Sequence, residues 1–322
     1  MSTKIDPAEN PSVDHHVRSF LKALNSSGGK PLETLPPAEA RKVLVDAQAG
    51  AALPPCDVQE RTITQDGIEV KITIVRPEGA TQESPVFMFF HGGGWILGDY
   101  PTHERFVRDL VVDSGFPAVF VNYTPSPEAH YPVAINQAYA ATKWVATNGG
   151  EIGVDGKRLA LVGNSVGGNM TAVVALMAKD KGGPEIKCEI MFWPVTDANF
   201  ETGSYNEYSE GYFLTKPMMI WFWDAYTTDL EKRKEIYASP LQASLDELKG
   251  LPPSLVQTAG NDVLRDEGEA YARKLDQAGV DVTAVRYEGL IHDYGLLNAL
   301  SNVPAVRDAL HQAAETLRKH LK

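Results

Sequence analysis

A serine flanked by glycines marks the segment GNSVG at residues 163–167. The apolar residues 159–162 before it predict a strand, and the amphipathic stretch 167–179 after it predicts a helix. A sharp turn from strand to helix strains the backbone of the residue between them, which neighbouring glycines permit. The turn also places the serine hydroxyl at a helix N-terminus, where developing negative charge is stabilised. The pattern therefore predicts Ser165 as the nucleophile of an acyl-transfer reaction.

Three consecutive glycines follow a histidine at residues 91–94, directly after the apolar run 86–90. Acyl transfer needs N–H donors aimed at the oxyanion of its tetrahedral intermediate, and a glycine loop supplies them without obstructing side chains. We expect Gly92 and Gly93 to donate to this oxyanion hole, with the N–H of Val166 as a third donor. The alternative, a loop that cradles a phosphate, lacks an accompanying GxGxxG or P-loop motif. The histidine itself is expected to shape the loop.

The base has to come from the eight histidines of the chain. His292 lies in a loop directly after the strand-like run 282–287, whereas the other seven fall in predicted helices, in loops after early strands or near the N-terminus. In a doubly wound sheet, reactive groups gather at the carboxyl ends of the strands. His292 is therefore predicted to deprotonate Ser165.

The carboxylate that orients the base should follow the nucleophile and precede the histidine. Asp262 is the first acidic residue after the strand-like run 255–258, and we assign it this role. Asp266 and Glu267 come next, but acidic residues are favoured at the start of a helix for local reasons, which is the role expected of them. The order serine, aspartate, histidine differs from the orders found in the chymotrypsin and subtilisin types of serine protease.

Strand-like runs alternate with helical stretches over most of the chain, and these elements must position the reactive residues. Alternation of this length predicts an α/β fold with a mostly parallel central sheet flanked by helices. The expected strands are residues 68–75, 86–90, 118–122, 158–162, 186–192, 255–258 and 282–287. The expected helices in this part are residues 104–114, 133–146, 167–179, 267–278 and 303–321.

Two segments outside this alternation predict a helical cap over the site. Residues 1–50 contain two helical runs whose apolar stripes need a partner, and residues 199–245 lack a strand signal but are rich in aromatic side chains. The catalytic core is accordingly expected over 51–198 and 246–322. The alternative is an ordinary helical subdomain whose aromatic residues form its own core. The side chains expected to bind substrate are Trp95, Asn164, Tyr212, Phe213 and Trp221.

The composition argues against several kinds of partner and location. A net charge of −12 at pH 7 argues against nucleic acid and anionic membranes as partners, because both need a basic surface. No metal-binding or dinucleotide motif is present, so no cofactor and no metal are expected. The N-terminus lacks an apolar signal core and no apolar run is long enough to span a membrane, which favours the cytoplasm. Cys56 and Cys188 stand outside any paired motif and are expected to be free thiols.

Together these motifs resemble the hormone-sensitive-lipase family of bacterial esterases, also called bacterial family IV. The resemblance rests on HGGGW at 91–95, GNSVGG at 163–168, DVLRDEGEAYARKL at 262–275 and the histidine loop at 289–295. It extends over nearly the whole chain, residues 10–318. The family implies an α/β-hydrolase fold with a helical cap, no cofactor, and a homodimer that pairs through the last strand.

Several positions depart from the usual pattern of that family. The family usually has Asp or Thr at the place of Asn164 and Ala at the place of Val166. Val166 keeps its N–H, although its bulk is expected to narrow the acyl pocket. The residue after the catalytic histidine is often Gly in the family; here it is Asp293, a carboxylate expected to raise the pKa of His292 if the two lie close. The stretch 122–128 also differs from the family's usual acidic and basic pattern.

The residues and the resemblance predict a carboxylic ester hydrolase that acts on small-molecule esters with short to medium acyl chains, through an acyl-enzyme. Two alternatives stay open. An amidase, lactonase or deacetylase could use the same three residues, because a triad does not choose between leaving groups. A non-enzymatic small-molecule receptor could use the same scaffold.

Overall fold

The computed structural model describes residues 5–322. Its strands are β1 (Cys56–Gln65), β2 (Ile68–Pro77), β3 (Ser84–Phe90), β4 (Ala118–Asn122), β5 (Val154–Asn164), β6 (Cys188–Phe192), β7 (Ser254–Asn261) and β8 (Val282–Ile291). Its α-helices are α1 (His15–Asn25), α2 (Pro37–Ala47), α3 (Tyr100–Ser114), α4 (Val133–Asn148), α5 (Val166–Asp180), α6 (Gly203–Glu207), α7 (Lys216–Tyr226), α8 (Leu245–Leu248), α9 (Arg265–Gln277) and α10 (Pro304–Leu321).

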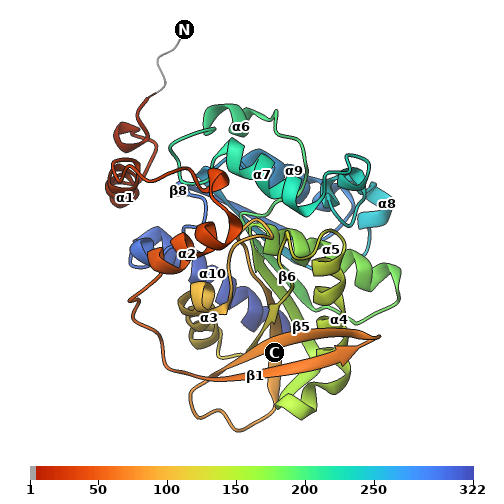
Figure 1. The fold of residues 1–322 in the computed structure, drawn as a ribbon. Helices are drawn as coiled ribbons and strands as arrows, with labels where there is room; N and C mark the ends of the chain where they lie inside the picture. Colours follow the sequence, from red (N-terminus) through yellow and green to blue (C-terminus); the bar gives the residue numbers. More distant parts are fainter. Residues whose placement is uncertain (1–4) are drawn as a thin grey trace.

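The strands form one sheet in the order β1-β2-β4-β3-β5-β6-β7-β8. Strand β2 runs antiparallel to β1 and β4, and every pairing from β4 onward to β8 is parallel. Helices α3 and α10 pack together on one side of the sheet, and α4 and α5 pack together on the other (Figure 1). The predicted fold class, a mostly parallel central sheet flanked by helices, is confirmed.

The central strands are covered on both faces. Every residue of β6 and β7 is buried, and so is every residue of β3 after Ser84. Strands covered on both faces contain continuous apolar runs, which is why the sequence located them. Their carboxyl ends lie at one edge of the sheet, where the residues that follow β5, β7 and β8 can meet.

The sequence pattern predicts no strand before residue 68, but β1 begins at Cys56 and pairs with β2 along its whole length. Strand β1 lies at the edge of the sheet with most of its side chains exposed, so it lacks the alternation of a half-buried strand. The turn between the two strands is Asp66-Gly67, and both residues have positive φ, 54° and 77°. This two-residue hairpin signal was the local clue to the missed strand.

The N-terminal segment contacts the insertion that follows β6. Asn10 Nδ2 donates to Tyr212 Oη at 2.8 Å, and Asn25 Nδ2 donates to the carbonyl of Gly211 at 3.1 Å. Figure 1 shows α6 and α7 above the sheet with α1 beside them. The two segments expected to form a cap therefore touch each other, although they are far apart in the sequence.

The N-terminal segment also contacts the last two strands. Ser12 Oγ donates to Asn261 Oδ1 at 2.9 Å, at the end of β7. The N–H of Asp14 donates to the carbonyl of Gly289 in β8, also at 2.9 Å. These bonds join the start of the chain to the strands that lead to Asp262 and His292.

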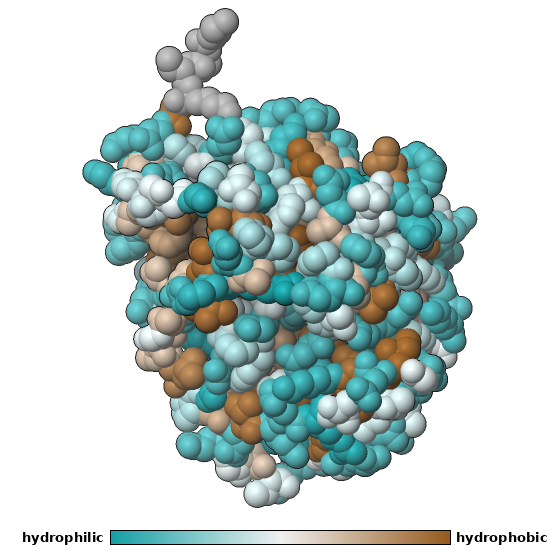
Figure 2. Space-filling view, viewed as in Figure 1, coloured by the Kyte–Doolittle hydropathy of each residue, from teal (hydrophilic) through white to brown (hydrophobic). Residues whose placement is uncertain are grey.

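The surface agrees with the polar composition of the chain. Hydrophilic side chains dominate the face shown in Figure 2, and apolar residues are scattered over it. Within residues 5–322, no helix combines the length and the hydrophobicity needed to cross a bilayer. Cys56 is partly buried and Cys188 is buried, and both are free thiols.

Candidate active site

Ser165 lies at the turn between β5 and α5. Strand β5 ends one residue before it, and α5 begins one residue after it. Its backbone has φ 56° and ψ −120°, a conformation that residues other than glycine rarely adopt. Such strain persists only where the surrounding structure enforces it, and it is common at reactive sites.

The glycines near Ser165 are required because the surrounding backbone leaves no room for a side chain at these positions. A Cβ on Gly163 would lie 2.1 Å from the carbonyl oxygen of Gly167, and a Cβ on Gly167 would lie 1.9 Å from that of Phe90. A Cβ on Gly168 would lie 2.8 Å from Pro194. The turn therefore packs directly against β3 and against the residues that follow β6.

The three residues predicted to react are brought together. His292 Nε2 lies 3.0 Å from Ser165 Oγ, and His292 Nδ1 lies 2.8 Å from Asp262 Oδ2. All three side chains are almost fully buried, with Ser165 4% exposed and the other two 2% exposed. Both distances are within the range of a hydrogen bond, so a proton can pass from the serine to an imidazole whose orientation the aspartate fixes.

A second carboxylate lies beside the histidine. Asp293 Oδ1 is 3.9 Å from His292 Nε2, so the two groups meet the condition under which this carboxylate was expected to raise the pKa of the histidine. Burial lowers the pKa of His292, but the charges of Asp262 and Asp293 raise it by more, and it lies above the ordinary value of 6.5. Burial also raises the pKa of Asp293 above its ordinary value, against the opposing effects of His292 and two hydrogen-bond donors.

The predicted oxyanion donors need one correction. The N–H of Gly92 donates to Asn164 Oδ1 at 3.0 Å, so the assignment of Gly92 to the oxyanion hole is wrong. The next two residues of the loop, Gly93 and Gly94, have φ of 101° and 63°. Within residues 5–322 their N–H groups have no acceptor in the protein. Val166 is the first residue of α5, and the N–H groups of a first helical turn have no partner inside the helix.

Asn164 connects the glycine loop to the histidine loop. Its Oδ1 accepts the bond from Gly92, and its Nδ2 donates to Asp293 Oδ1 at 3.2 Å. The side chain has no exposed surface. Because its amide is engaged on both sides, Asn164 holds the two loops, and its assignment as a substrate-binding residue is corrected.

The aromatic residues near the glycine loop fill the space between core and insertion. Trp95 stacks on Tyr226 with ring centroids 3.9 Å apart and meets Trp223 edge-on at 5.0 Å. A Cβ on Gly94 would lie 2.1 Å from the ring of Phe222. Trp95 is thus a packing residue. Phe222, which is missing from the predicted binding residues, is a further aromatic contact between the insertion and this loop.

The other predicted binding residues have different neighbours. Tyr212 accepts the bond from Asn10, and the ring of Phe213 lies 6.3 Å from that of Phe20. Both therefore fasten the insertion to the N-terminal segment. Trp221 is partly buried with its ring 5.1 Å from that of Phe222.

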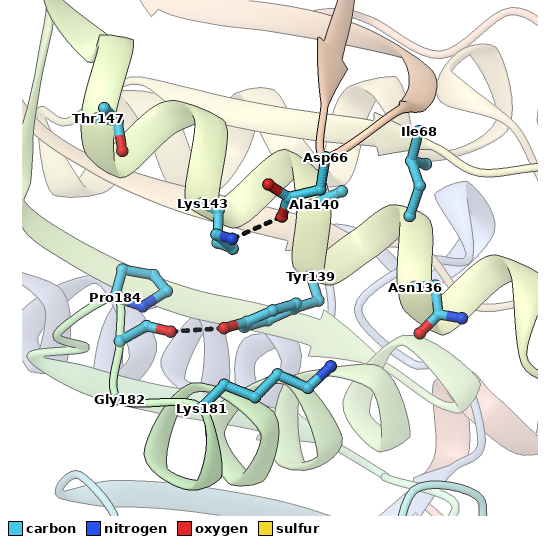
Figure 3. Close-up of a pocket in the computed structure, with 11 residues that line it drawn as sticks. Asp66, Ile68, Asn136, Tyr139, Ala140, Lys143, Thr147, Lys181, Gly182 and Pro184 are labelled. Carbon is cyan, nitrogen blue, oxygen red and sulfur yellow. Dashed lines mark hydrogen bonds and ion pairs between the residues drawn. The ribbon is translucent and has the colours of Figure 1, made fainter.

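A cavity of about 560 Å³ lies elsewhere, between the β1–β2 turn, α4 and the loop after α5 (Figure 3). Two pairs of its lining residues bind each other: Lys143 Nζ lies 2.5 Å from Asp66 Oδ2, and Tyr139 Oη donates to the carbonyl of Gly183 at 2.6 Å. The triad residues do not line it. This cavity therefore offers nothing to the chemistry of Ser165.

The comparisons with known proteins agree with this geometry. A family model described as the α/β-hydrolase fold matches residues 87–296. The chain belongs to this α/β-hydrolase family. The resemblance to the hormone-sensitive-lipase group, stated from the motifs, is thereby confirmed.

Named relatives of this α/β-hydrolase span most of its length. A carboxylesterase of Mycobacterium tuberculosis is 33% identical, over 84% of this chain and 84% of its own. An ethyl acetate hydrolase of Pseudomonas putida is 31% identical, over 96% of this chain and all of its own. The crystal structure of a thermostable esterase from Pseudomonas putida is 63% identical, covers 97% of this chain and 99% of its own, and superimposes with a TM-score of 0.96.

Proposed function

We infer that this α/β-hydrolase is a carboxylic ester hydrolase, and we propose that it works through an acyl-enzyme on Ser165. The observation that carries the proposal is the pair of hydrogen bonds at His292, 3.0 Å to Ser165 Oγ and 2.8 Å to Asp262 Oδ2. The relatives named as esterases support the class of bond.

The proposed reaction has two halves. His292 Nε2 takes the proton of Ser165 as Oγ attacks the ester carbonyl, and it then gives that proton to the leaving alcohol oxygen. A water attacks the acyl-enzyme in the same way, transfers its proton through His292, and releases the carboxylic acid and the free serine. Asp262 holds the imidazole in the tautomer that accepts at Nε2 and stabilises the imidazolium that forms.

We assign the oxyanion hole to Gly93, Gly94 and Val166. Among residues 5–322 their N–H groups have no acceptor, whereas the N–H of Gly92 is bound to Asn164. Donors that need no reorganisation stabilise the tetrahedral intermediate best, and each is worth about 3 kcal/mol of barrier.

The proposed substrates are small esters with short to medium acyl chains. Phe222 lies against Gly94, and the stack of Trp95 on Tyr226 fills the space beside the same loop, which limits the room for a long chain. The N-terminal segment 1–50 and the insertion 199–245 are proposed to act together as a cap, supported by the Asn10–Tyr212 bond. The two free thiols support a reducing compartment such as the cytoplasm.

The test is hydrolysis of p-nitrophenyl esters from acetate to palmitate by the wild type and by Ser165→Ala in parallel. We expect the wild type to prefer short chains and the variant to lose at least about 10⁴-fold in kcat. Thermal unfolding checks that the variant is folded. Matched amides and lactones test the other bond classes. Retained activity in Ser165→Ala would refute the assignment of the nucleophile, and no turnover by either protein would favour the receptor alternative.

A further inference from the structure

Glu267 is a buried carboxylate that the triad does not use. The sequence explains it as an acidic residue in the first turn of α9, but its side chain is only 1% exposed. Its Oε1 accepts the N–H of Thr196 at 2.7 Å and the N–H of Asp197 at 3.2 Å. Its main-chain carbonyl accepts the hydroxyl of Thr196 at 2.9 Å. A carboxyl group is costly to bury, so such a group needs compensating contacts.

The backbone N–H groups that Glu267 binds belong to a loop that contacts the nucleophile Ser165. We call residues 193–197, directly after β6, the rear loop. Within it, the N–H of Val195 donates to the carbonyl of Ser165 itself at 3.1 Å. Pro194 contacts the turn as well, since it leaves no room for a Cβ on Gly168. The rear loop therefore sets the position of the Ser165 backbone from the side opposite to β3.

The other end of this connection is the loop that carries Asp262. The N–H of Leu264 donates to Asp262 Oδ1 at 3.0 Å, and the N–H of Arg265 donates to its carbonyl at 3.2 Å. Helix α9 begins at Arg265, so Glu267 is two residues into the helix that starts on these bonds. The Glu267 side chain thus links two segments. One is the rear loop, which contacts Ser165, and the other is the start of α9, whose backbone hydrogen-bonds to Asp262.

We propose that Glu267 is a positioning residue for the triad, whose carboxyl oxygen fixes the separation between Ser165 and Asp262 that His292 has to bridge. The inference rests on the proposed function of these three residues. A displacement of 1 Å between reacting groups can cost about 100-fold in rate, so a contact that holds both ends of the triad matters to the reaction. Burial raises the pKa of Glu267 well above its ordinary value, which agrees with a need for an acceptor oxygen rather than for a charge.

The chain provides a matched control in Glu189. This glutamate is fully buried at the start of β6, and its Oε1 accepts the hydroxyl of Ser254 at 2.6 Å. In the described structure, Oε2 of Glu189 has no hydrogen-bond partner, and Oε2 of Glu267 has none either. Glu189 and Ser254 lie at the amino ends of parallel strands, however, at the edge of the sheet away from the triad. Loss of either glutamate should destabilise the fold, but only the loss of Glu267 should affect catalysis.

The experiment compares Glu267→Ala, Glu267→Gln and Glu189→Ala with the wild type. Each is assayed for kcat and KM on p-nitrophenyl acetate across the pH range, and for thermal unfolding. We expect Glu267→Ala to lose about 100-fold in kcat with KM changed less than about twofold. The acid limb of the pH profile of Glu267→Ala should lie at lower pH than that of the wild type. The reason is that Asp262, once displaced, raises the pKa of His292 less than it does in the wild type. Glu267→Gln keeps the acceptor and should retain kcat within about fivefold.

Glu189→Ala should unfold at lower temperature while it keeps the kcat and pH profile of the wild type. The inference is overturned if Glu267→Ala changes kcat and pH profile no more than Glu189→Ala does, or if Glu267→Gln is as impaired as Glu267→Ala. If Glu267→Ala does not fold, Glu267→Asp takes its place, because the shorter side chain moves the acceptor oxygen away from the rear loop by one methylene. The same criteria for kcat and pH profile then apply to Glu267→Asp. If Ser165→Ala is inactive while Glu267→Ala is normal, the positioning role alone fails and the proposed function stands.

Discussion

The side chain of Asn164 joins the nucleophile turn to the glycine loop, because its Oδ1 accepts the N–H of Gly92 at 3.0 Å. The other end of the same amide donates to Asp293 at 3.2 Å. Asn164 and Asp293 are two positions at which this chain departs from the pattern of the family it resembles. The structure shows that these departures contact each other, so an amide at one position suits a carboxylate at the other.

The first prediction concerns this pair. Asn164→Asp keeps the acceptor for Gly92 but replaces the donor to Asp293 with a second carboxylate. We expect kcat/KM to fall about tenfold, as for coupled neighbours. The double variant Asn164→Asp with Asp293→Gly should recover to within about threefold of the wild type, since it removes the repulsion and glycine suits the φ of 58° at that position. A double variant no more active than Asn164→Asp alone would contradict the coupling.

The second prediction concerns pH. The reaction needs neutral His292, so kcat/KM should fall as the pH falls through the pKa of this residue, which lies above 6.5. Asp293 raises that pKa by its charge, and Asp293→Asn removes the charge while keeping the shape. The acid limb of the pH profile should therefore move to lower pH in Asp293→Asn. An acid limb that stays in place, or moves upward, would show that Asp293 does not act on His292 in this way.

The third prediction concerns the turn that carries the nucleophile. Gly167→Ala would place a methyl group 1.9 Å from the carbonyl oxygen of Phe90, which is main chain and cannot move aside cheaply. We expect a loss of about 3 kcal/mol or more in the free energy of unfolding, measured by urea denaturation. Gly150→Ala is the control, because a Cβ there would meet nothing within 4 Å and φ is not positive. Equal stability of the two variants would contradict the close packing of the turn on β3.

The reactive residues could be predicted because short stretches of sequence specify them. Ser165 follows from a strand, a glycine-flanked turn and a helix that are contiguous. Asp262 comes directly after the buried strand β7, and His292 comes directly after the more exposed strand β8. The mistakes about the site concern contacts between distant parts of the chain, whereas β1 was missed because an exposed edge strand lacks apolar alternation. The partner that occupies Gly92 lies 72 residues away, and the partner of Glu267 lies 71 residues away. A preference of acidic residues for helix starts explains the position of Glu267 in its helix but says nothing about the loop it holds.

The bond from Ser12 to Asn261 spans 249 residues, and its neighbour from Asp14 reaches even further, to Gly289. Contacts between such distant residues form slowly, since a long loop has to close before they are gained. The segment that contains α1 is therefore among the last to dock, because its partners belong to β7 and β8. During refolding, the N-terminal helices should stay open to proteases after the sheet is protected, and esterase activity should return only when that sensitivity is lost.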